Sequence, residues 1–191
     1  MSKENYRKRV TLHVADNHQD MNFALMVRVA VYVGEIGIPL DVAIDGNDFC
    51  ATHIIAKVDG KPVGSMRLRF FDGVAIMERL AILKEARLKR YGGRGVAWEL
   101  GEFAVNFCRL KGYTKFFGVS RDNMVEFWKK FAPKDAEFRL IEGAEVEYAG
   151  RISYPMEGDA PELPYAAKGL HTINHLMATE SALPEMMHEA A

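Results

Sequence analysis

The chain has 191 residues, of which 49% are hydrophobic. It contains 25 Lys and Arg and 26 Asp and Glu residues, so its formal net charge is -1 at pH 7. A chain this close to neutral has no overall field that would attract nucleic acid or an acidic membrane. No apolar run reaches bilayer-spanning length, two cysteines are too few for a disulfide framework, and the N-terminus lacks the apolar part of a signal peptide. We expect a cytoplasmic protein with no nucleic-acid partner and no membrane partner.

The first half of the chain predicts one helix and a group of strands. Apolar residues recur at helical spacing over residues 21–36. The runs THIIAKV (52–58) and VGSMRLRFF (63–71) predict two strands joined by Asp59-Gly60, which is a hairpin signal. GVAIMERLAIL, at 73–83, is a third strand candidate.

The second half predicts a helix that starts near Gly95 and stops at Gly112, where a terminal glycine is expected. A strand over 114–120, a short helix over 123–131 and two strands within 137–155 follow. The predicted fold class is therefore a mixed α/β (α+β) domain with one strand–loop–helix crossover at its centre.

The composition changes after Pro155, where prolines and glycines indicate a linker before a helical tail over about 170–189. We expect a domain over residues 1–155 and an appended linker and tail over 156–191. The methionines of the tail suit an adaptable contact, either with the parent domain or with a twin subunit in a homodimer. His171 and His175 lack a third ligand, so no metal is expected.

The segment KRYGGRGVAWELGEF, residues 89–103, places three glycines and three basic side chains in front of the central helix. Glycines allow close approach of an anion to the backbone, and a helix N-terminus offers unpaired N–H groups. This pattern indicates a phosphate-binding loop, with a solvated surface turn as the alternative. The loop lacks the Gly-Lys-Ser/Thr ending of a Walker motif, and the hairpins before it disfavour a dinucleotide-binding fold.

The stretch ERLAILKEARLKRYGGRGVAWEL (78–100) resembles the central motif of the GNAT N-acetyltransferase superfamily. Other segments over about 12–155 follow the order of that superfamily: VRVAVYVGEIGIP, ATHIIAKVDGKPVGSMRLR and DNMVEFWKKF. The resemblance implies a central, mostly antiparallel sheet flanked by helices, acetyl-CoA as co-substrate, and an acceptor that is a small-molecule amine.

The resemblance also implies which residues hold acetyl-CoA. Backbone groups of the splayed central strand would hold the acetyl and pantetheine parts, and the loop would hold the pyrophosphate. The candidate cofactor-binding residues are Leu80, Ala81, Ile82, Arg87, Arg90, Tyr91, Gly92, Gly93, Arg94, Gly95, Val96, Ala97, Arg121, Asn123 and Trp128. Two registers are open: one ends on Gly95 and Ala97, and the other, Arg90-x-x-Gly93-x-Gly95, starts the helix two residues earlier.

Glu78 is the candidate general base. In a regular strand it shares a face with Ile76 and Leu80, where desolvation would raise the pKa of its carboxyl group. The resemblance places a glutamate that acts as base, often through water, at this point of the strand. The alternative is a structural ion pair with Arg67 or Arg69.

The leaving-group acid departs from the pattern of the superfamily. A tyrosine on the short helix commonly protonates the departing thiolate there, but FWKKF puts Trp128 in that position, and an indole N–H is not a proton acid. Either no side chain supplies the proton, or Tyr91 or Tyr32 does, or catalysis has been lost.

The acceptor pocket of the superfamily lies between the first helix and the first strand. Arg28, Tyr32, Asp45 and Asp48 are the candidate substrate-binding residues, since carboxylates there would attract an amine. A solvated acidic loop is the alternative. The leading function is acetyl-CoA-dependent N-acetyl transfer to a small primary amine. Arg28, the spaced aspartates and VGSMRL are also similar to acyl-homoserine-lactone and N-acyl amino acid synthases, which use long acyl donors, and a non-catalytic acyl-CoA-binding module is the third reading.

Overall fold

The computed structural model describes residues 9–121, 124–131, 133–148 and 150–163. The expected tail helix over 170–189, with His171 and His175, lies outside the described residues. No helix within the described ranges combines the length and the apolar character needed to cross a membrane.

The described chain builds one eight-stranded sheet in the order β1-β2-β3-β4-β7-β10-β8, with β9 paired to β10. The pair β4–β7 is parallel, and all the other pairs in this sheet are antiparallel. This arrangement confirms the expected mixed fold with a mostly antiparallel sheet. Its strands are β1 (Val10–Val14), β2 (Thr52–Val58), β3 (Lys61–Phe71), β4 (Val74–Ile82), β7 (Lys115–Arg121), β8 (Glu137–Leu140), β9 (Val146–Tyr148) and β10 (Arg151–Asp159).

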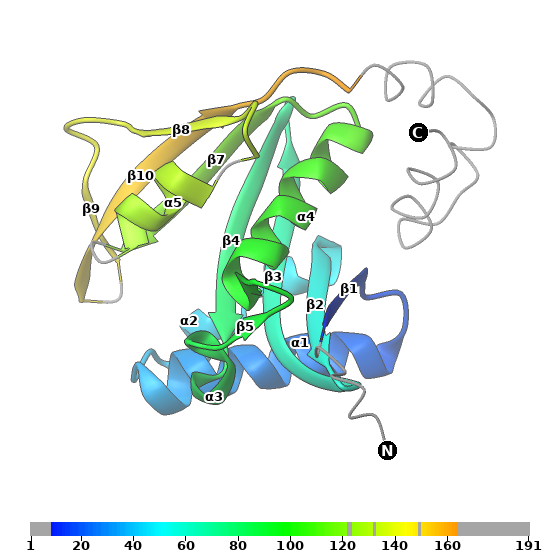
Figure 1. Cartoon of the computed structure of the whole chain (residues 1–191). Helices are drawn as coiled ribbons and strands as arrows, with labels where there is room; N and C mark the ends of the chain where they lie inside the picture. The colour runs from blue at the N-terminus through cyan, green and yellow to red at the C-terminus, as the bar shows by residue number, and fades with distance from the viewer. Residues whose placement is uncertain (1–8, 122–123, 132, 149, 164–191) are drawn as a thin grey trace.

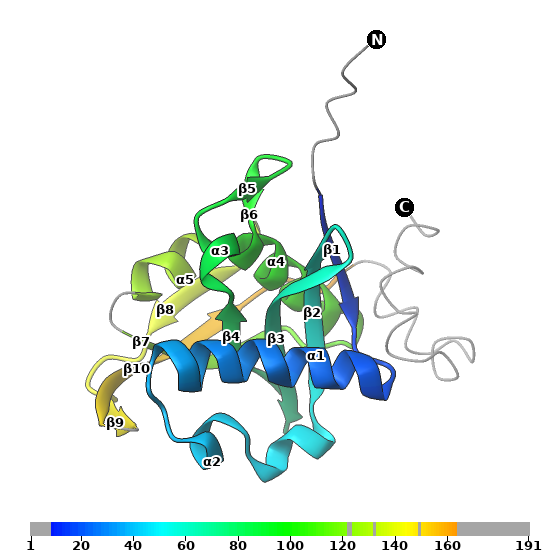
Figure 2. The ribbon, with the colours of Figure 1, turned by 90° about the horizontal axis from the view of Figure 1, so that it is seen from below.

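Helices cover both faces of the sheet (Figures 1 and 2). One face carries α4 (Val96–Leu110) and α5 (Val125–Phe131). The other carries α1 (His18–Arg28), the π-helix η1 (Val29–Glu35), α2 (Leu40–Ala43) and the 3₁₀ turn η2 (Gly46–Cys50). In Figure 2, α1 lies across the strands on the side opposite α4.

The main apolar core lies between the sheet and α4. Leu100 and Ala104 of α4 pack against Ile54, Met66 and Leu68 of the strands, and each of these side chains is almost fully buried. Burying a side chain of this size contributes about 1.5–3 kcal/mol, so this layer holds the helix that follows the glycine loop in a fixed position.

Two predicted segments differ from the structure at the N-terminal end. Strand β1 was not predicted, although Val10, Leu12 and Val14 alternate toward the core. The predicted helix over 21–36 begins earlier, at His18, because the Asn17 side chain accepts a hydrogen bond from the Asp20 N–H at 2.9 Å and caps it. From Val29 the α-helix widens into the π-helix η1.

The strands around Asp59-Gly60 form the expected hairpin, with φ values of 51° and 75° at these two residues. The first residues of the predicted linker, 156–159, are instead part of a strand. Strand β10 continues past Pro155 to Asp159, and its residues 156–159 pair with both β7 and β8. Pro155 and Gly158 therefore lie inside the sheet, where the composition had indicated a linker from residue 156 onward.

Gly118 ends the parallel pairing of β7 with β4, opposite Met77. A Cβ atom at residue 118 would lie 2.9 Å from the Met77 carbonyl oxygen. We expect Gly118→Ala to lower the free energy of unfolding by about 1–3 kcal/mol, because backbone must move to admit the methyl group. Gly46→Ala is the matched control, since its Cβ would meet nothing within 4 Å. Equal urea midpoints for the two variants would contradict this close approach.

Candidate active site

A cleft of about 980 Å³ opens where β4 and β7 separate. Paired positions of the two strands end at Met77 and Gly118, and in Figure 1 the strands meet near the top of the view and spread apart toward the bottom. Residues of η1 line the cleft on one face of the sheet, and residues of the glycine loop, α4 and α5 line it on the other. The cleft therefore passes through the sheet from one helical layer to the other.

The edge of the cleft is shaped by a bulge in β4. Arg79 has a φ of 57°, and the pairing of β3 with β4 shifts register between Ser65 and Arg67. A non-glycine residue in the left-handed region costs about 1–3 kcal/mol, and here the side chain is held in place because the Arg79 guanidinium donates to Asp45 Oδ2 at 2.9 Å. The bulge turns β4 away from β7.

The structure separates the three backbone positions expected to hold the donor. Leu80 and Ile82 line the cleft, whereas Ala81 packs against Val27 and Val31 on the helix side. The Leu80 carbonyl accepts a hydrogen bond from the Tyr32 hydroxyl at 3.3 Å. Leu80 and Ile82 thus present the exposed edge of the strand to the cleft.

The glycine loop contains regular structure that the sequence did not predict. A short helix, α3 (Lys84–Arg87), precedes a two-stranded hairpin of β5 (Arg90–Tyr91) and β6 (Arg94–Gly95). Gly92 and Gly93 form its turn with φ values of 67° and 101°. Helix α4 then begins at Val96 with Gly95 as its N-cap and no side-chain cap, which agrees with the register that ends on Gly95 and Ala97.

The basic side chains of the loop differ in their contacts. Arg87 donates to Glu35 Oε2 and to the Ile82 carbonyl, both at 2.8 Å, and Arg94 pairs with Glu102. Arg90 is exposed, while Tyr91 packs against the core. Exposed ion pairs contribute about 0–1 kcal/mol, so an incoming anion can replace these carboxylates at little cost.

The strand pattern predicted that Glu78 lies among apolar neighbours, but the structure places it against two arginines. Its Oε1 accepts from Arg67 Nε at 2.9 Å and from Arg69 Nε at 2.5 Å. The bulge at residue 79 is the reason, because it places Glu78 directly opposite Arg67. The alternative, a structural ion pair, is therefore what the structure shows. The carboxylate nevertheless lines the cleft, and its side chain is 20% exposed.

Asp45 and Asp48 are not a free acidic lining for an acceptor amine. Arg67, only 1% exposed, donates to Asp45 at 2.7 Å and 3.0 Å and to Asp48 at 2.8 Å. Arg28, also 1% exposed, donates to Asp48 at 2.7 Å. The expected substrate-binding roles of Arg28 and Asp48 are thus replaced by a buried ion cluster that joins α1, η2 and β3.

This ion cluster fixes the charge states of its members. The hydrogen bonds from Arg67 hold the pKa of Asp45 well below its usual range. Burial acts to raise the pKa of Asp48, but hydrogen bonds from Arg67 and Arg28 outweigh it and the pKa is lowered. Burial lowers the pKa of His53, whose Nδ1 lies 3.4 Å from the Arg28 guanidinium, so this imidazole is neutral at pH 7.

Of the four residues expected to bind the acceptor, Tyr32 lines the cleft. Burial raises the pKa of its hydroxyl group. Trp128 lines the opposite side, packed edge-on against Phe127 at 5.5 Å between ring centroids. Arg121, expected beside the donor, is the last residue of β7 and lines the cleft. Asn123 lies outside the described residues.

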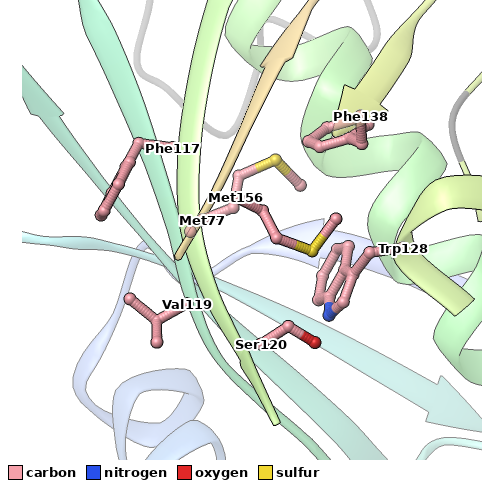
Figure 3. A pocket seen from close by; sticks show the side chains of 8 residues that line it. Met77, Phe117, Val119, Ser120, Trp128, Phe138 and Met156 are labelled. Atoms are coloured by element: carbon pink, nitrogen blue, oxygen red, sulfur yellow. The ribbon is translucent and has the colours of Figure 1, made fainter. Parts of the chain in front are cut away.

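A small apolar cavity of about 20 Å³ adjoins the cleft at the point where β4 and β7 part (Figure 3). Met77, Met156, Trp128 and Phe138 surround it, with the Ser120 hydroxyl at its rim. Sequence analysis singled out Trp128 but not Met77, Met156, Phe138 or Ser120. The alternation of the strand over 114–120 could have placed Ser120 on this face, but the methionines come from two strands that are distant in sequence.

The comparisons with known proteins agree with this geometry. The model of the acetyltransferase (GNAT) family matches residues 35–132, which is about half of the chain. The chain belongs to this family. An uncharacterized N-acetyltransferase of Bacillus subtilis, YjcF, is 35% identical over 80 residues, which are 42% of this chain and 57% of that protein. The chain spans about half the length of the two curated relatives that it matches, 57% and 50%.

Solved structures share the GNAT fold at low sequence identity. An acyl-CoA N-acyltransferase from Pseudomonas aeruginosa superposes with a TM-score of 0.63 at 20% identity and covers 78% of this chain and 98% of that one. The CoA-dependent acyl-homoserine lactone synthase BjaI, solved with SAM and isopentyl-CoA, gives a TM-score of 0.62 at 13% identity over 85% of this chain and 88% of that one. The weaker similarity to acyl-homoserine-lactone synthases is thus confirmed at the level of the fold.

Arg67 is the central cation of the buried ion cluster. We expect Arg67→Leu to lower the free energy of unfolding by about 3–5 kcal/mol, because it leaves buried carboxylates without their counter-charge. Arg139→Leu is the control, since Arg139 pairs with Glu157 and Asp159 at the surface and should contribute less than about 1 kcal/mol. Urea denaturation compares the two variants, and a loss of similar size in both would contradict the energetic weight given to burial.

Stability should fall in acid because the pKa values of Asp45 and Asp48 are lower in the folded state. The unfolded chain then binds protons more readily, so the stabilisation is complete above the unfolded pKa of about 3.9 and is lost as the pH falls below it. Asp45→Asn should be less stable than the wild type at pH 7, and the gap should narrow by pH 3. A gap that stays constant in urea titrations across this range would contradict the assignment.

Proposed function

We propose that this GNAT protein transfers an acetyl group from acetyl-CoA to the primary amine of a small molecule. The observation that carries the proposal is the continuity of the cleft. It runs from the N-terminus of α4, past the exposed edge of β4, to the Tyr32 side of the sheet. A donor bound along one end and an acceptor entering from the other would meet at the point where β4 and β7 separate.

The glycine hairpin and α4 fit the pyrophosphate of CoA. Gly95 caps the helix without a side chain, and a Cβ there would meet only the Lys89 carbonyl, at 4.0 Å. The first backbone N–H groups of α4 have no partners within the helix and lie at its positive end, beside Gly95 and Ala97, which line the cleft. Arg87, Arg90 and Arg94 supply charge along the same rim. The edge of β4 at Leu80 and Ile82 would hold the pantetheine.

The small cavity beside the cleft supports acetyl as the donor group. A volume of about 20 Å³ admits roughly one or two water-sized groups, which suits a methyl group but not a long acyl chain. Met77, Met156 and Trp128 close the space behind it. This observation favours the acetyltransferase over the long-chain synthase.

Glu78 and Tyr32 are the side chains that we assign to proton transfer. Glu78 Oε1 takes the two short hydrogen bonds from Arg67 and Arg69, and Oε2 has a single longer contact of 3.5 Å, from Arg69. Oε2 is therefore the oxygen that would accept a proton from the amine, directly or through water. The Tyr32 hydroxyl, which is protonated at neutral pH, would donate to the departing thiolate.

Gly95 tests the donor site. We expect Gly95→Glu to weaken acetyl-CoA binding at least about tenfold in calorimetric titration, because a charged side chain would occupy the open space at the helix N-terminus. Gly46→Glu introduces the same side chain into open space outside the cleft and should bind like the wild type. If Gly95→Glu bound acetyl-CoA with unchanged affinity, the hairpin would be only a turn.

The two proton-transfer residues are tested by turnover. We expect Glu78→Gln and Tyr32→Phe each to lower kcat by about 10²-fold, the usual contribution of such a group, and to leave acetyl-CoA binding intact. Glu157→Gln, on the exposed surface of β10, is the control that should keep full activity. Wild-type kcat in either variant would remove that residue from the mechanism. A wild-type protein that binds acetyl-CoA and acetylates no amine would instead be the non-catalytic module.

A further inference from the structure

Arg121 points to the acceptor side of the cleft. Phe116 and Ser120 of β7 face the layer of α4 and α5, since Phe116 packs on Phe138 and Ser120 lies beside Trp128. Side chains alternate along a strand, so Arg121 projects with Phe117 and Val119 to the other face. Figure 3 shows these two neighbours on the side of β7 away from Trp128. Arg121 had been expected among the residues that bind the donor, but its side chain projects to the face of the sheet opposite α4 and α5.

Arg121 differs from two other arginines that line the cleft. Arg79 pairs with Asp45, and Arg87 pairs with Glu35. Within the described ranges, no carboxylate lies within ion-pair distance of Arg121, although the side chain is half-buried and lines the cleft. A guanidinium offers a planar pair of donors that matches a carboxylate.

The wall behind Arg121 is positive rather than acidic. Four guanidinium groups, of Arg28, Arg67, Arg69 and Arg79, share three carboxylates, of Asp45, Asp48 and Glu78. His53 adds no charge, because burial keeps it neutral at pH 7. The ion cluster thus keeps one excess positive charge, and Arg121 adds a second beside the cleft.

We propose that Arg121 binds a carboxylate of the acceptor, so that the substrate is an amino acid or a similar amine that carries a carboxylate. The inference rests on the proposed acetyl transfer and specifies its acceptor. The same positive wall disfavours an ammonium group, which lowers the pKa of the bound amine and raises its neutral fraction. Carboxylate recognition and amine activation then have one electrostatic origin, and proton removal by Glu78 begins from a less protonated amine.

The test compares matched acceptors that differ in the carboxylate alone. Leucine with leucinamide, phenylalanine with phenylalaninamide and lysine with lysinamide are assayed by CoA release from acetyl-CoA. Converting a carboxylate to an amide lowers the pKa of the neighbouring amine, so chemistry without recognition favours the amide. We expect the wild type to prefer the carboxylate in at least one pair. We expect Arg121→Gln to lower kcat/KM for that acid about 10–100-fold, the cost of losing a charged hydrogen bond, and to change the amide less than about threefold.

Arg121→Lys, which keeps the charge but not the planar fork, should fall between the wild type and Arg121→Gln. Arg139→Gln, an arginine on the distant surface of β8, should match the wild type. A wild type that binds acetyl-CoA but prefers no acid in any pair, including one that turns over none of them, overturns the carboxylate site. Equal losses for acid and amide in Arg121→Gln overturn it as well. A wild type that does not bind acetyl-CoA would instead overturn the proposed function itself.

Discussion

The interaction on which the site depends is the buried ion cluster centred on Arg67. A charge taken out of water is costly unless counter-charges and hydrogen bonds surround it, and Arg67 meets this condition with three carboxylates from η2 and β4. Asp45 belongs to the same cluster and holds Arg79 in its left-handed conformation. The bulge that opens the cleft is thus held by a loop more than thirty residues earlier in the chain.

Much of the fold could be predicted because it is encoded locally. The Asp-Gly turn at 59–60, the alternating strands and the glycine before α4 each act within a few residues. The start of α4 near Gly95 could be predicted because glycines mark both ends of the helix, at Gly95 and at Gly112. Strand β1 was missed because five residues give a weak period. Pro155 was misread because β10 continues beyond it through pairing with β7 and β8, two strands that no local pattern names as its partners.

The site was predicted less well than the fold, and the bulge at Arg79 explains most of the difference. Regular alternation put Glu78 among apolar side chains, whereas the extra residue in β4 turns it toward Arg67. The aspartates suggested an acidic pocket because their partners lie far away in sequence, on α1 and β3. The residue pattern of one segment cannot show that a distant segment supplies the opposite charge.

The parallel pair β4–β7 joins two antiparallel half-sheets through four paired positions, from Val74 and Lys115 to Met77 and Gly118. Beyond this short seam the two half-sheets separate, and the cleft lies between them. A small change of twist along this seam moves the two strands more with distance from it, so it changes the width of the cleft. Substitutions at Val74 or Lys115, at the end of this seam away from the cleft, would therefore change the width of the cleft without altering a residue that lines it.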